Sequence, residues 1–420
     1  MKVVIIGSGG REHALCVSLK KSQNVSKIYC IPGNAGTSFI AENVELDINN
    51  FELIEKFIIQ KKIDLVIVGP EEPLVNGLSD FLENKQIKVF GPNRLASQLE
   101  GSKIFTKNLC EKYEIPTAKF GVFYDFESAI KYSKKCKLPI VIKADGLAAG
   151  KGVYICENDK QYLNAIKDIF EGKFGNTKKV LIEEFLKGEE MSFFIISDGK
   201  TFKKFGTAQD HKRVFEGDKG KNTGGMGAYS PSRLDSKDLD KKITEKIINP
   251  TLQGLRDLKT EFKGFLYIGL MIVENEPFLI EYNVRMGDPE CQTILPRLKT
   301  DFAKIIDACV NKKLNSVDIE WSDKKSLCVV LCSKGYPEEY LKNVEINNLE
   351  NIRLHENEFI FHAGTKIKNN KLFSKGGRVL NFVILSDNFK NSRNQALKLI
   401  KDLNWKNGFF RKDIGYKVIE

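Results

Sequence analysis

Cysteine pairs, histidines and long apolar runs are all scarce in this sequence. Nine cysteines occur in irregular positions without a C-x-x-C pair, and only four histidines accompany them. An odd, irregular set argues against a disulfide framework, and the few histidines argue against a zinc site. One of the longest apolar runs, residues 265–273, is far below the about 18 residues of a membrane helix, and the apolar stretch 3–6 is too short for a signal peptide. These absences predict a cytoplasmic protein with no membrane partner.

The charge balance is positive, but no long basic block is present. Lys and Arg number 66 against 55 Asp and Glu, which gives a net charge of +11. The lysines are spread along the chain, often beside acidic residues, so a solvated lysine-rich surface explains them and no nucleic-acid partner is expected. A basic nucleic-acid binder or a nucleotide-regulated binding protein remains the alternative from another class. A mobility-shift assay at varied salt separates it, because phosphate-backbone binding weakens steeply with salt.

The length of 420 residues, 42% of them hydrophobic, favours about three domains with sizeable cores. Residues 1–102 alternate strands and helices, which is typical of a parallel α/β sheet covered on both faces. Residues 103–322 change to an α+β pattern, and residues 323–420 look like a small third α+β unit. The expected strands are 2–6, 27–31, 63–68, 88–90, 140–144, 152–156, 180–185, 191–197, 265–274, 277–283, 327–331, 359–361 and 378–385. The expected helices begin at about residue 11 and span 51–61, 78–84, 126–134, 160–170, 245–259 and 392–403.

One long segment, residues 210–231, is rich in glycine and charge and has no hydrophobic period. Loops of this length are usually functional or disordered. We therefore expect this segment to be a loop that is either functional or disordered.

A first glycine turn lies between the first strand and the first helix. Gly7 and Gly9 fit the dinucleotide pattern G-x-G-x-x-G, but Glu12 occupies the third glycine position. No acidic residue stands out at the end of the second strand, so a hydride-transfer enzyme is disfavoured. The bare amides at a helix N-terminus suit a single phosphate, and a purely structural tight turn is the alternative.

A second glycine loop, KADGLAAGKGV at 143–153, lies between two predicted strands. It is not a P-loop, because only three residues separate Gly146 from Gly150 and Gly152 replaces the hydroxyl residue. We expect a hairpin-like lid whose amides cover a triphosphate, with Lys143 at the end of an apolar strand. A plain hairpin with an exposed lysine is the alternative.

A bend in VLIEEFLKGEEMS, residues 180–192, follows a predicted strand. Backbone groups of such a bend can pair with an adenine edge, and a nearby carboxylate can accept ribose hydroxyls. This signal is weak alone, because Glu-rich turns are common.

A late strand, residues 278–285, carries the most chemistry. Strand alternation predicts Leu279, Glu281, Asn283 and Arg285 on one face. Glu and Asn offer hard oxygen ligands that suit Mg²⁺, and Arg285 can hold a phosphate or acyl phosphate. The alternative is a surface strand with an ion pair between Glu281 and Arg285.

The order of these sites resembles the ATP-grasp ligases, and the chain resembles the phosphoribosylamine–glycine ligase family from end to end. The motifs that carry the resemblance are GSGGREHA (7–14), PGNAGT (32–37), GPE (69–71), LEGSK (99–103), KADGLAAGKG (143–152), QDHKR (209–213), NTGGMGAYSP (222–231), GDPE (287–290) and FHAGT (361–365). Ala208 and Met286 depart from the family's usual Ser and Phe. Residues 267–271 also lack the acidic metal ligand that many ATP-grasp enzymes carry, which leaves the metal with fewer protein ligands.

The resemblance implies an ATP-grasp domain at 103–322 with a mobile lid at about 117–190, between an N-terminal pre-ATP-grasp domain and a C-terminal domain. It implies that ATP, glycine and 5-phosphoribosylamine give ADP, phosphate and glycinamide ribonucleotide through glycyl phosphate, in de novo purine biosynthesis. Another ATP-grasp carboxylate–amine ligase of the pathway, such as a carboxylase-type member, is the closest rival. The segments at 210–213 and 287–290 favour the glycine ligase.

The resemblance also implies residue roles and partners. ATP would be held by Lys103, Lys143, Gly146, Gly150, Lys151, Gly152, Glu183, Phe185, Leu186, Glu190 and Leu279. Glu281 and Asn283 would bind Mg²⁺ or Mn²⁺, and Arg285 with Lys143 would be catalytic. Asp210 and Lys212 would place glycine, while Gly9, Gly10, Asn34, Ala35, Gly36 and Asp288 would hold the phosphoribosyl part. A monomer with only small-molecule partners is expected.

Overall fold

The N-terminal unit is a five-stranded parallel sheet, as the alternating pattern predicted. The computed structural model describes residues 1–147, 152–175 and 178–419. The strand order is β3-β2-β1-β4-β5, and every neighbouring pair is parallel. Side chains of β1 alternate between two hydrophobic cores, with Val3 and Ile5 in one and Val4 and Ile6 in the other. This alternation is why the strands read as continuous apolar runs.

The elements of this unit lie close to their predicted positions. In chain order they are β1 (Lys2–Gly7), α1 (Gly10–Lys20), β2 (Lys27–Pro32), β3 (Glu42–Asn43), α2 (Phe51–Lys61), β4 (Leu65–Val68), α3 (Glu71–Asn76), α4 (Leu78–Glu83), β5 (Val89–Phe90), α5 (Gln98–Gly101) and α6 (Lys103–Lys112). The sequence did not predict β3, α3 or α5, which are too short to show a period, and the ten-residue helix α6 was also not predicted.

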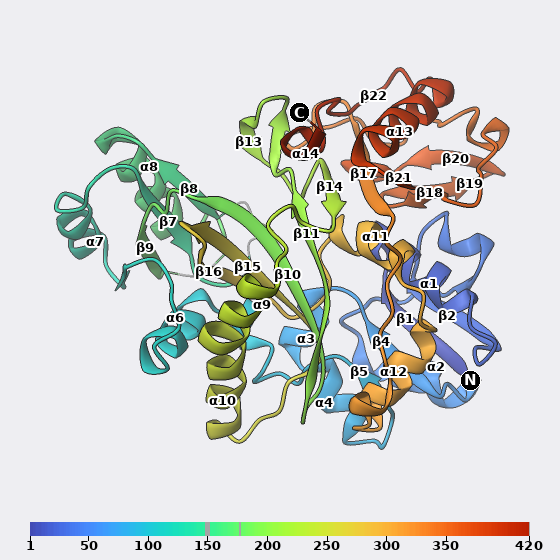
Figure 1. Cartoon of the computed structure of the whole chain (residues 1–420), viewed down its shortest axis with the longest axis horizontal. Coiled ribbons are helices and arrows are strands. Elements are labelled where there is room, and N and C mark those ends of the chain that lie inside the picture. The colour runs from blue at the N-terminus through green and yellow to red at the C-terminus, as the bar shows by residue number, and fades with distance from the viewer. Residues whose placement is uncertain (148–151, 176–177, 420) are drawn as a thin grey trace.

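A small α+β unit projects on the left of Figure 1. Its four-stranded antiparallel sheet has the order β6-β9-β7-β8 and a hydrophobic core of its own with α7 and α8. The bounds are β6 (Phe120–Phe123), α7 (Phe126–Ser133), β7 (Ile140–Ala144), β8 (Val153–Cys156), α8 (Asp159–Phe170) and β9 (Val180–Glu184). Strands β7 and β8 form the predicted hairpin around the second glycine loop.

One long sheet runs through the rest of the molecule in the order β16-β15-β10-β11-β14-β17-β21-β18, and β22 joins it at β17. Its strands are β10 (Glu189–Asp198), β11 (Phe202–Asp210), β14 (Gly227–Ser230), β15 (Lys263–Val273), β16 (Glu276–Asn283), β17 (Lys325–Ser333), β18 (Glu358–His362), β21 (Arg378–Ser386) and β22 (Gly408–Phe409). The C-terminal unit therefore has its main strands in a sheet that it shares with the middle of the chain.

The prediction that residues 210–231 form a loop is wrong, because the segment contains strands. It contains a two-stranded hairpin, β12 (Arg213–Phe215) with β13 (Lys219–Asn222), and then β14, which pairs with β11 and β17. The local sequence hides β14, because this strand finds its partner β17 about a hundred residues later, with Gly227 opposite Val329.

The predicted helix at 245–259 is part of a longer rod. Helix α9 (Lys237–Ile243) passes through a π-helical turn, Thr244–Ile248, into α10 (Asn249–Asp257). Pro250 follows this turn and has no amide N–H to donate, which fits an interruption of the α-helical hydrogen bonds there. The remaining elements are α11 (Glu290–Ile294), α12 (Phe302–Val310), β19 (Thr365–Lys368), β20 (Lys371–Ser374), α13 (Phe389–Leu403) and α14 (Tyr416–Ile419).

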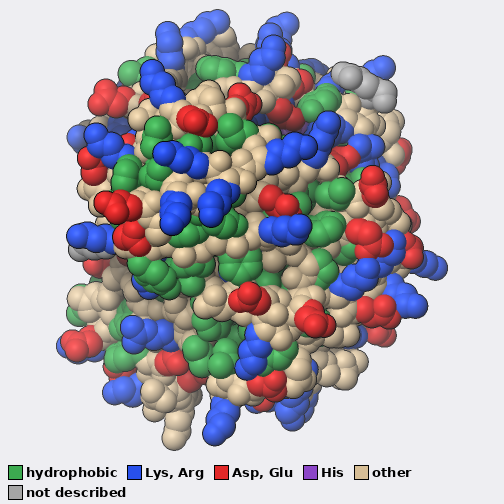
Figure 2. Space-filling view, turned by 90° about the vertical axis from the view of Figure 1, so that its left-hand side faces the viewer, with side chains coloured by type: hydrophobic (Ala, Val, Ile, Leu, Met, Phe, Trp, Pro, Cys, Tyr) green, Lys and Arg blue, Asp and Glu red, His purple; other side chains and the backbone are tan. Residues whose placement is uncertain are grey.

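No helix in the described part of the chain is long and apolar enough to cross a membrane. On the face drawn in Figure 2, lysine, arginine and acidic side chains are interspersed. This mixture is typical of a solvated charged surface, as the lysine distribution predicted.

Buried histidines join the N-terminal and C-terminal units. The backbone N–H of His362 donates to Nδ1 of His13 at 2.8 Å, and both rings are buried. Burial lowers the pKa of His13 to about 3, with the nearby His362 acting in the same direction, and burial lowers the pKa of His362 to about 4. Both histidines are therefore neutral in the folded protein at neutral pH.

We expect the buried contact between His13 and His362 to make the stability of the protein fall in acid. The unfolded histidines take up protons below about pH 6.5 while the folded ones do not, so stability falls as pH drops through that range. Each histidine contributes about 2 kcal/mol to this loss between pH 6.5 and 5. Urea unfolding at pH 7 and 5 should show a smaller loss for His13→Gln than for the unmodified protein. The exposed His355, changed to Gln, is the control, and equal losses for all three proteins would contradict the expectation.

Candidate active site

Lys143 and Glu183 form a buried ion pair between two neighbouring strands. Lys143 is the penultimate residue of β7, opposite Leu181, and Glu183 lies two residues further along the antiparallel strand β9. The ammonium Nζ lies 2.9 Å from both carboxylate oxygens, and each residue is 5% exposed. The alternative of a plain hairpin with an exposed lysine is therefore wrong. Glu183, predicted to frame adenine, has its carboxylate committed to a lysine.

A second lysine shares this carboxylate, and the sequence reasoning missed it. Lys107 Nζ lies 3.3 Å from Glu183 Oε1 and 2.6 Å from Thr117 Oγ1, and Lys107 is 2% exposed. Lys107 follows Lys103 by four residues on α6, so both lie on one helix face. That spacing was the available signal.

The start of the glycine loop is fastened to α6. Lys103 Nζ donates to Gly146 O at 2.9 Å, and Asp145 Oδ1 accepts from Ser102 Oγ at 3.1 Å and Ile104 N at 3.2 Å. Gly146 has φ +91°, a backbone conformation that suits glycine. At the other side of the loop, Gly152 O accepts from Ala144 N. The predicted Gly150 and Lys151 lie outside the described residues.

The predicted adenine residues surround the bend after β9. Phe185 is 38% exposed, Leu186 is half-buried and Leu279 is 1% exposed. Leu279 is fixed by its N–H, which donates to Pro116 O at 2.7 Å. The predicted ribose ligand, Glu190, instead accepts from Lys212 Nζ at 3.1 Å in this structure.

A β-bulge changes the predicted face of β16. Gly269 pairs with Glu281 and Leu270 with Leu279, so Ile280 has no partner on β15. The extra residue breaks the alternation, and Leu279 belongs to the buried core face with Tyr282 while Glu281 and Asn283 alternate with it. The prediction that Leu279 shares their face is wrong.

Glu281 and Asn283 are the residues on this strand that could hold a cation. Both are half-buried on one face of β16, opposite Gly269 and Tyr267 of β15. Burial lowers the pKa of Lys103, and the carboxylate of Glu281 acts against that shift, which places Glu281 near Lys103. A carboxylate and an amide oxygen fit Mg²⁺ that takes its remaining ligands from phosphates and water. Within the described ranges, no group of three or more His, Cys, Asp or Glu side chains is arranged around a metal position.

Arg285 is held by two carboxylates of the N-terminal unit. Its Nε lies 3.2 Å from Glu71 Oε2, and its Nη2 lies 2.6 Å from Glu100 Oε1. The alternative ion pair with Glu281 is therefore not what orders this guanidinium. Arg285 lowers the pKa of Glu71 to about 2, whereas burial raises the pKa of Glu100 to about 7 despite Arg285.

A partly buried polar group lies where β10, β11 and α11 meet. Asp210 is half-buried, and burial together with the carboxylates of Glu290 and Glu190 raises its pKa to about 7 against the opposing charge of Lys212. Glu290, which the sequence reasoning left without a role, is 5% exposed and accepts from Ser192 Oγ at 3.3 Å. Burial acts to lower the pKa of Lys212, but the surrounding carboxylates outweigh it and raise this pKa. Glu190 has the largest effect among these carboxylates. The group is suited to a small zwitterion, because it offers both a cation and carboxylates.

The C-terminal tail fixes the segment that carries Asp210 and Lys212. Between them, His211 Nε2 accepts from Gly415 N at 3.2 Å. Arg411 donates to Arg213 O at 3.0 Å and to Asp218 Oδ1 at 2.8 Å, both on the β12–β13 hairpin. No local pattern in the sequence indicates this contact.

The first glycine turn binds an internal carboxylate. Gly9 N donates to Glu12 Oε2 at 2.5 Å, and Arg11 Nε lies 2.6 Å from Glu12 Oε1. Two residues after Gly9, Arg11 N donates to Asp288 Oδ2 at 3.1 Å. Glu12 therefore does not merely interrupt a glycine pattern, since its carboxylate caps the turn that was predicted to hold a phosphate, beside Gly9 and Gly10.

The side-chain amide of Asn34 is occupied by hydrogen bonds to the backbone. Its Nδ2 donates to Ser8 O, Gly9 O and His362 O, and its Oδ1 accepts from Gly36 N at 2.8 Å and Thr37 N at 3.0 Å. With its amide so engaged and Ala35 buried, a phosphoribosyl ligand would meet this segment mainly through its backbone.

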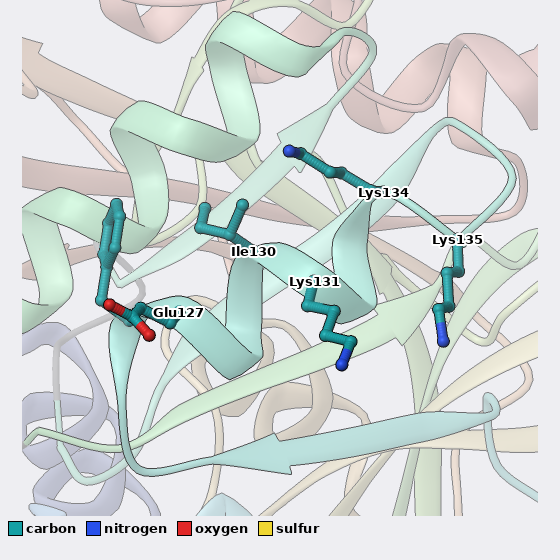
Figure 3. A pocket seen from close by; sticks show the side chains of 6 residues that line it. Glu127, Ile130, Lys131, Lys134 and Lys135 are labelled. Atoms are coloured by element: carbon teal, nitrogen blue, oxygen red, sulfur yellow. The ribbon is translucent and has the colours of Figure 1, made fainter.

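A surface hollow of about 440 Å³ lies elsewhere, along α7. Figure 3 shows it lined by Phe126, Glu127, Ile130, Lys131, Lys134 and Lys135, with the lysine side chains diverging. None of these residues belongs to the predicted site. This single helix face offers no converging polar groups, so the lysine, carboxylate and arginine groups described above remain the candidate active site.

Three comparisons connect this geometry with known proteins. The chain matches the family models for the N domain of phosphoribosylglycinamide synthetase at residues 1–100, its ATP-grasp (A) domain at 101–291 and its C domain at 326–417. It is 47% identical over 420 residues to phosphoribosylamine–glycine ligase of Agrobacterium fabrum, covering 100% of this chain and 99% of that protein. It is 44% identical over 421 residues to the Brucella melitensis protein of the same name, with the same two coverages. The crystal structure of phosphoribosylamine–glycine ligase from Thermotoga maritima superposes with a TM-score of 0.86 at 33% identity, covering 99% of this chain and 100% of that one.

Proposed function

Because the chain belongs to the phosphoribosylglycinamide synthetase family, we propose that it joins glycine to 5-phosphoribosylamine with ATP, giving glycinamide ribonucleotide, ADP and phosphate. The observation that carries the proposal is the full-length match combined with the buried Lys143–Glu183–Lys107 group beside the Glu281–Asn283 strand face. The enzyme acts in de novo purine biosynthesis.

The reaction proceeds in two displacements. The glycine carboxylate attacks the γ-phosphorus of ATP, which forms glycyl phosphate and releases ADP. The amine of phosphoribosylamine then attacks the glycyl carbonyl carbon, releases phosphate and loses a proton. Such phosphoryl transfer depends mainly on positioning and charge neutralisation.

The side chains divide this work. Lys103 and Lys143 hold the α- and β-phosphates once the nucleotide replaces their present partners Gly146 O and Glu183. Glu281 and Asn283 would hold Mg²⁺, or Mn²⁺, which neutralises phosphate charge when bound. Arg285 stabilises the transferring phosphoryl group, while Asp210 and Lys212 place glycine. Gly9, Gly10, Ala35, Gly36 and Asp288 surround the phosphoribosyl part.

Three organisational features belong to the same proposal. The domains span 1–102, 103–322 with a lid at about 117–190, and 323–420. The nine free cysteines, eight of them buried, fit a reducing compartment and hence a cytoplasmic enzyme. We propose a monomer that acts only on small molecules, which light scattering of the purified chain tests.

Omitting each substrate in turn tests the function. ADP release should require ATP, glycine and 5-phosphoribosylamine together, and activity with Mg²⁺ and Mn²⁺ should be compared in the same assay. Release that depends on bicarbonate instead of glycine would identify a carboxylase-type relative and overturn the proposal.

Loss of the tail contact should weaken glycine use. Arg411→Ala removes the donor that holds the β12–β13 hairpin, so Asp210 and Lys212 lose their fixed position. We expect the KM for glycine to rise by about tenfold while the dissociation constant for ATP is unchanged. Lys412→Ala, an exposed neighbour, is the control. An unaltered glycine KM in Arg411→Ala would remove the tail from the site.

A further inference from the structure

The buried lysine Lys107 has no place in the two displacements above, yet it occupies a costly position. It is 2% exposed, and burial lowers its pKa. Its ammonium and that of Lys143 contact the same carboxylate oxygen. Glu183 Oε1 lies 3.3 Å from Lys107 Nζ and 2.9 Å from Lys143 Nζ. An ammonium group taken out of water is destabilising unless it is paired and hydrogen-bonded, so this lysine needs an explanation beyond packing.

We propose that Lys107 is a positioning residue that competes with Lys143 for Glu183 and so frees Lys143 to bind the nucleotide phosphates. The inference rests on the proposed function, because it deepens the ATP site of that reaction. When Lys143 turns to ATP, Lys107 remains as the partner of the Glu183 carboxylate, which is then not left buried without a counter-charge. Without Lys107, the Glu183 carboxylate would have Lys143 as its partner and would keep it from the nucleotide.

The net charge of Lys107, Lys143 and Glu183 also favours phosphate binding. Two ammonium groups and one carboxylate leave this buried group with one net positive charge, which attracts a polyphosphate. Replacing Lys107 by methionine leaves no net charge and a closed Lys143–Glu183 pair. Removing the charge of Glu183 in the same chain restores one positive charge and releases Lys143.

Lys107 is also fixed in place, as a positioning residue must be. Its Nζ donates to Thr117 Oγ1 at 2.6 Å, and Thr117 Oγ1 donates to Leu279 O at 2.6 Å. Thr117 and Leu279 form an isolated parallel β-bridge, so this chain of hydrogen bonds links α6 to the strand of the metal ligands. The ammonium therefore cannot drift away when Lys143 leaves Glu183.

Calorimetric titration of the full-length protein with Mg-ATP tests the proposal. K107M is expected to bind Mg-ATP about tenfold or more weakly, because an ammonium charge is lost near the phosphates. The double variant K107M/E183Q is expected to bind more tightly than K107M, and E183Q no more weakly than the unmodified protein. A purely structural lysine predicts that the double variant binds no better than K107M.

Controls separate the possible failures. K112M changes an exposed lysine on the same helix and should leave affinity unchanged. Thermal unfolding identifies variants that do not fold. If K107M does not fold, the E183Q variant alone decides: weaker Mg-ATP binding by E183Q overturns the proposal, and undiminished binding supports it. Unchanged affinity in a folded K107M, or no recovery in the double variant, overturns the role of Lys107 alone. An unmodified protein that neither binds Mg-ATP nor releases ADP would overturn the proposed function instead.

Discussion

Replacing Arg285 by alanine should reduce the turnover number by about 10²–10³, with a much smaller effect on ATP affinity. In the proposed role the guanidinium acts most when charge moves between ATP and glycine, so its loss should appear in the rate more than in binding. Arg285→Lys should rescue only partly, because one ammonium cannot span Glu71 and Glu100 as the planar fork does. Calorimetric ATP affinity and steady-state turnover, measured on the same preparations, give the two quantities.

The carboxylate partners of Arg285 make a control necessary. Without the arginine, Glu100 and Glu71 lose their shared counter-charge, which destabilises the folded chain. Adding Glu100→Gln to Arg285→Ala should therefore restore much of the thermal stability without restoring turnover. If turnover returned together with stability, or if the single variant lost only ATP affinity, Arg285 would be a structural ion-pair residue and the reacting centre would lie elsewhere.

Glu281→Gln should remove most of the activity, and raised Mg²⁺ should rescue it only in part. Glu281 supplies the only carboxylate of the proposed metal pair, and its strand neighbour opposite is Gly269, which has no side chain to replace it. The measurement is turnover against Mg²⁺ concentration. Glu276→Gln, on the same strand but paired with Lys246 at 2.5 Å, is the matched control. Full activity of Glu281→Gln at ordinary Mg²⁺ would remove Glu281 from the metal site.

The sequence predicted the elements whose signals are local. Strands β1, β4 and β7 are apolar runs beside glycine or proline, and they were confirmed close to their bounds. Strand β14 was missed, since its glycine-rich sequence becomes a strand only by pairing with the distant β17. The bulge at Ile280 was also invisible, because the register depends on the neighbouring strand β15 and not on the period of β16 alone.

The site could be predicted where a motif marks it. Lys143 was recognised because it closes an apolar strand before a glycine loop, and the structure places it against a buried carboxylate. Lys107 resembled any solvated lysine of an amphipathic helix, and only the tertiary structure shows it buried. Glu12 was seen as a departure from a glycine pattern, although its carboxylate caps that turn. Which atoms a buried polar group contacts depends on long-range packing that local sequence does not encode.

The pairing of β14 with β17 limits how this polypeptide can be divided. Cutting the chain near residue 322 would separate two fragments whose strands belong to one sheet. Each fragment would then expose an unpaired hydrogen-bonding edge, and exposed edges of this kind favour aggregation. Chimeras that exchange the C-terminal portion between relatives must therefore preserve the complementarity of these two strands, and a split version would need both pieces to be produced together.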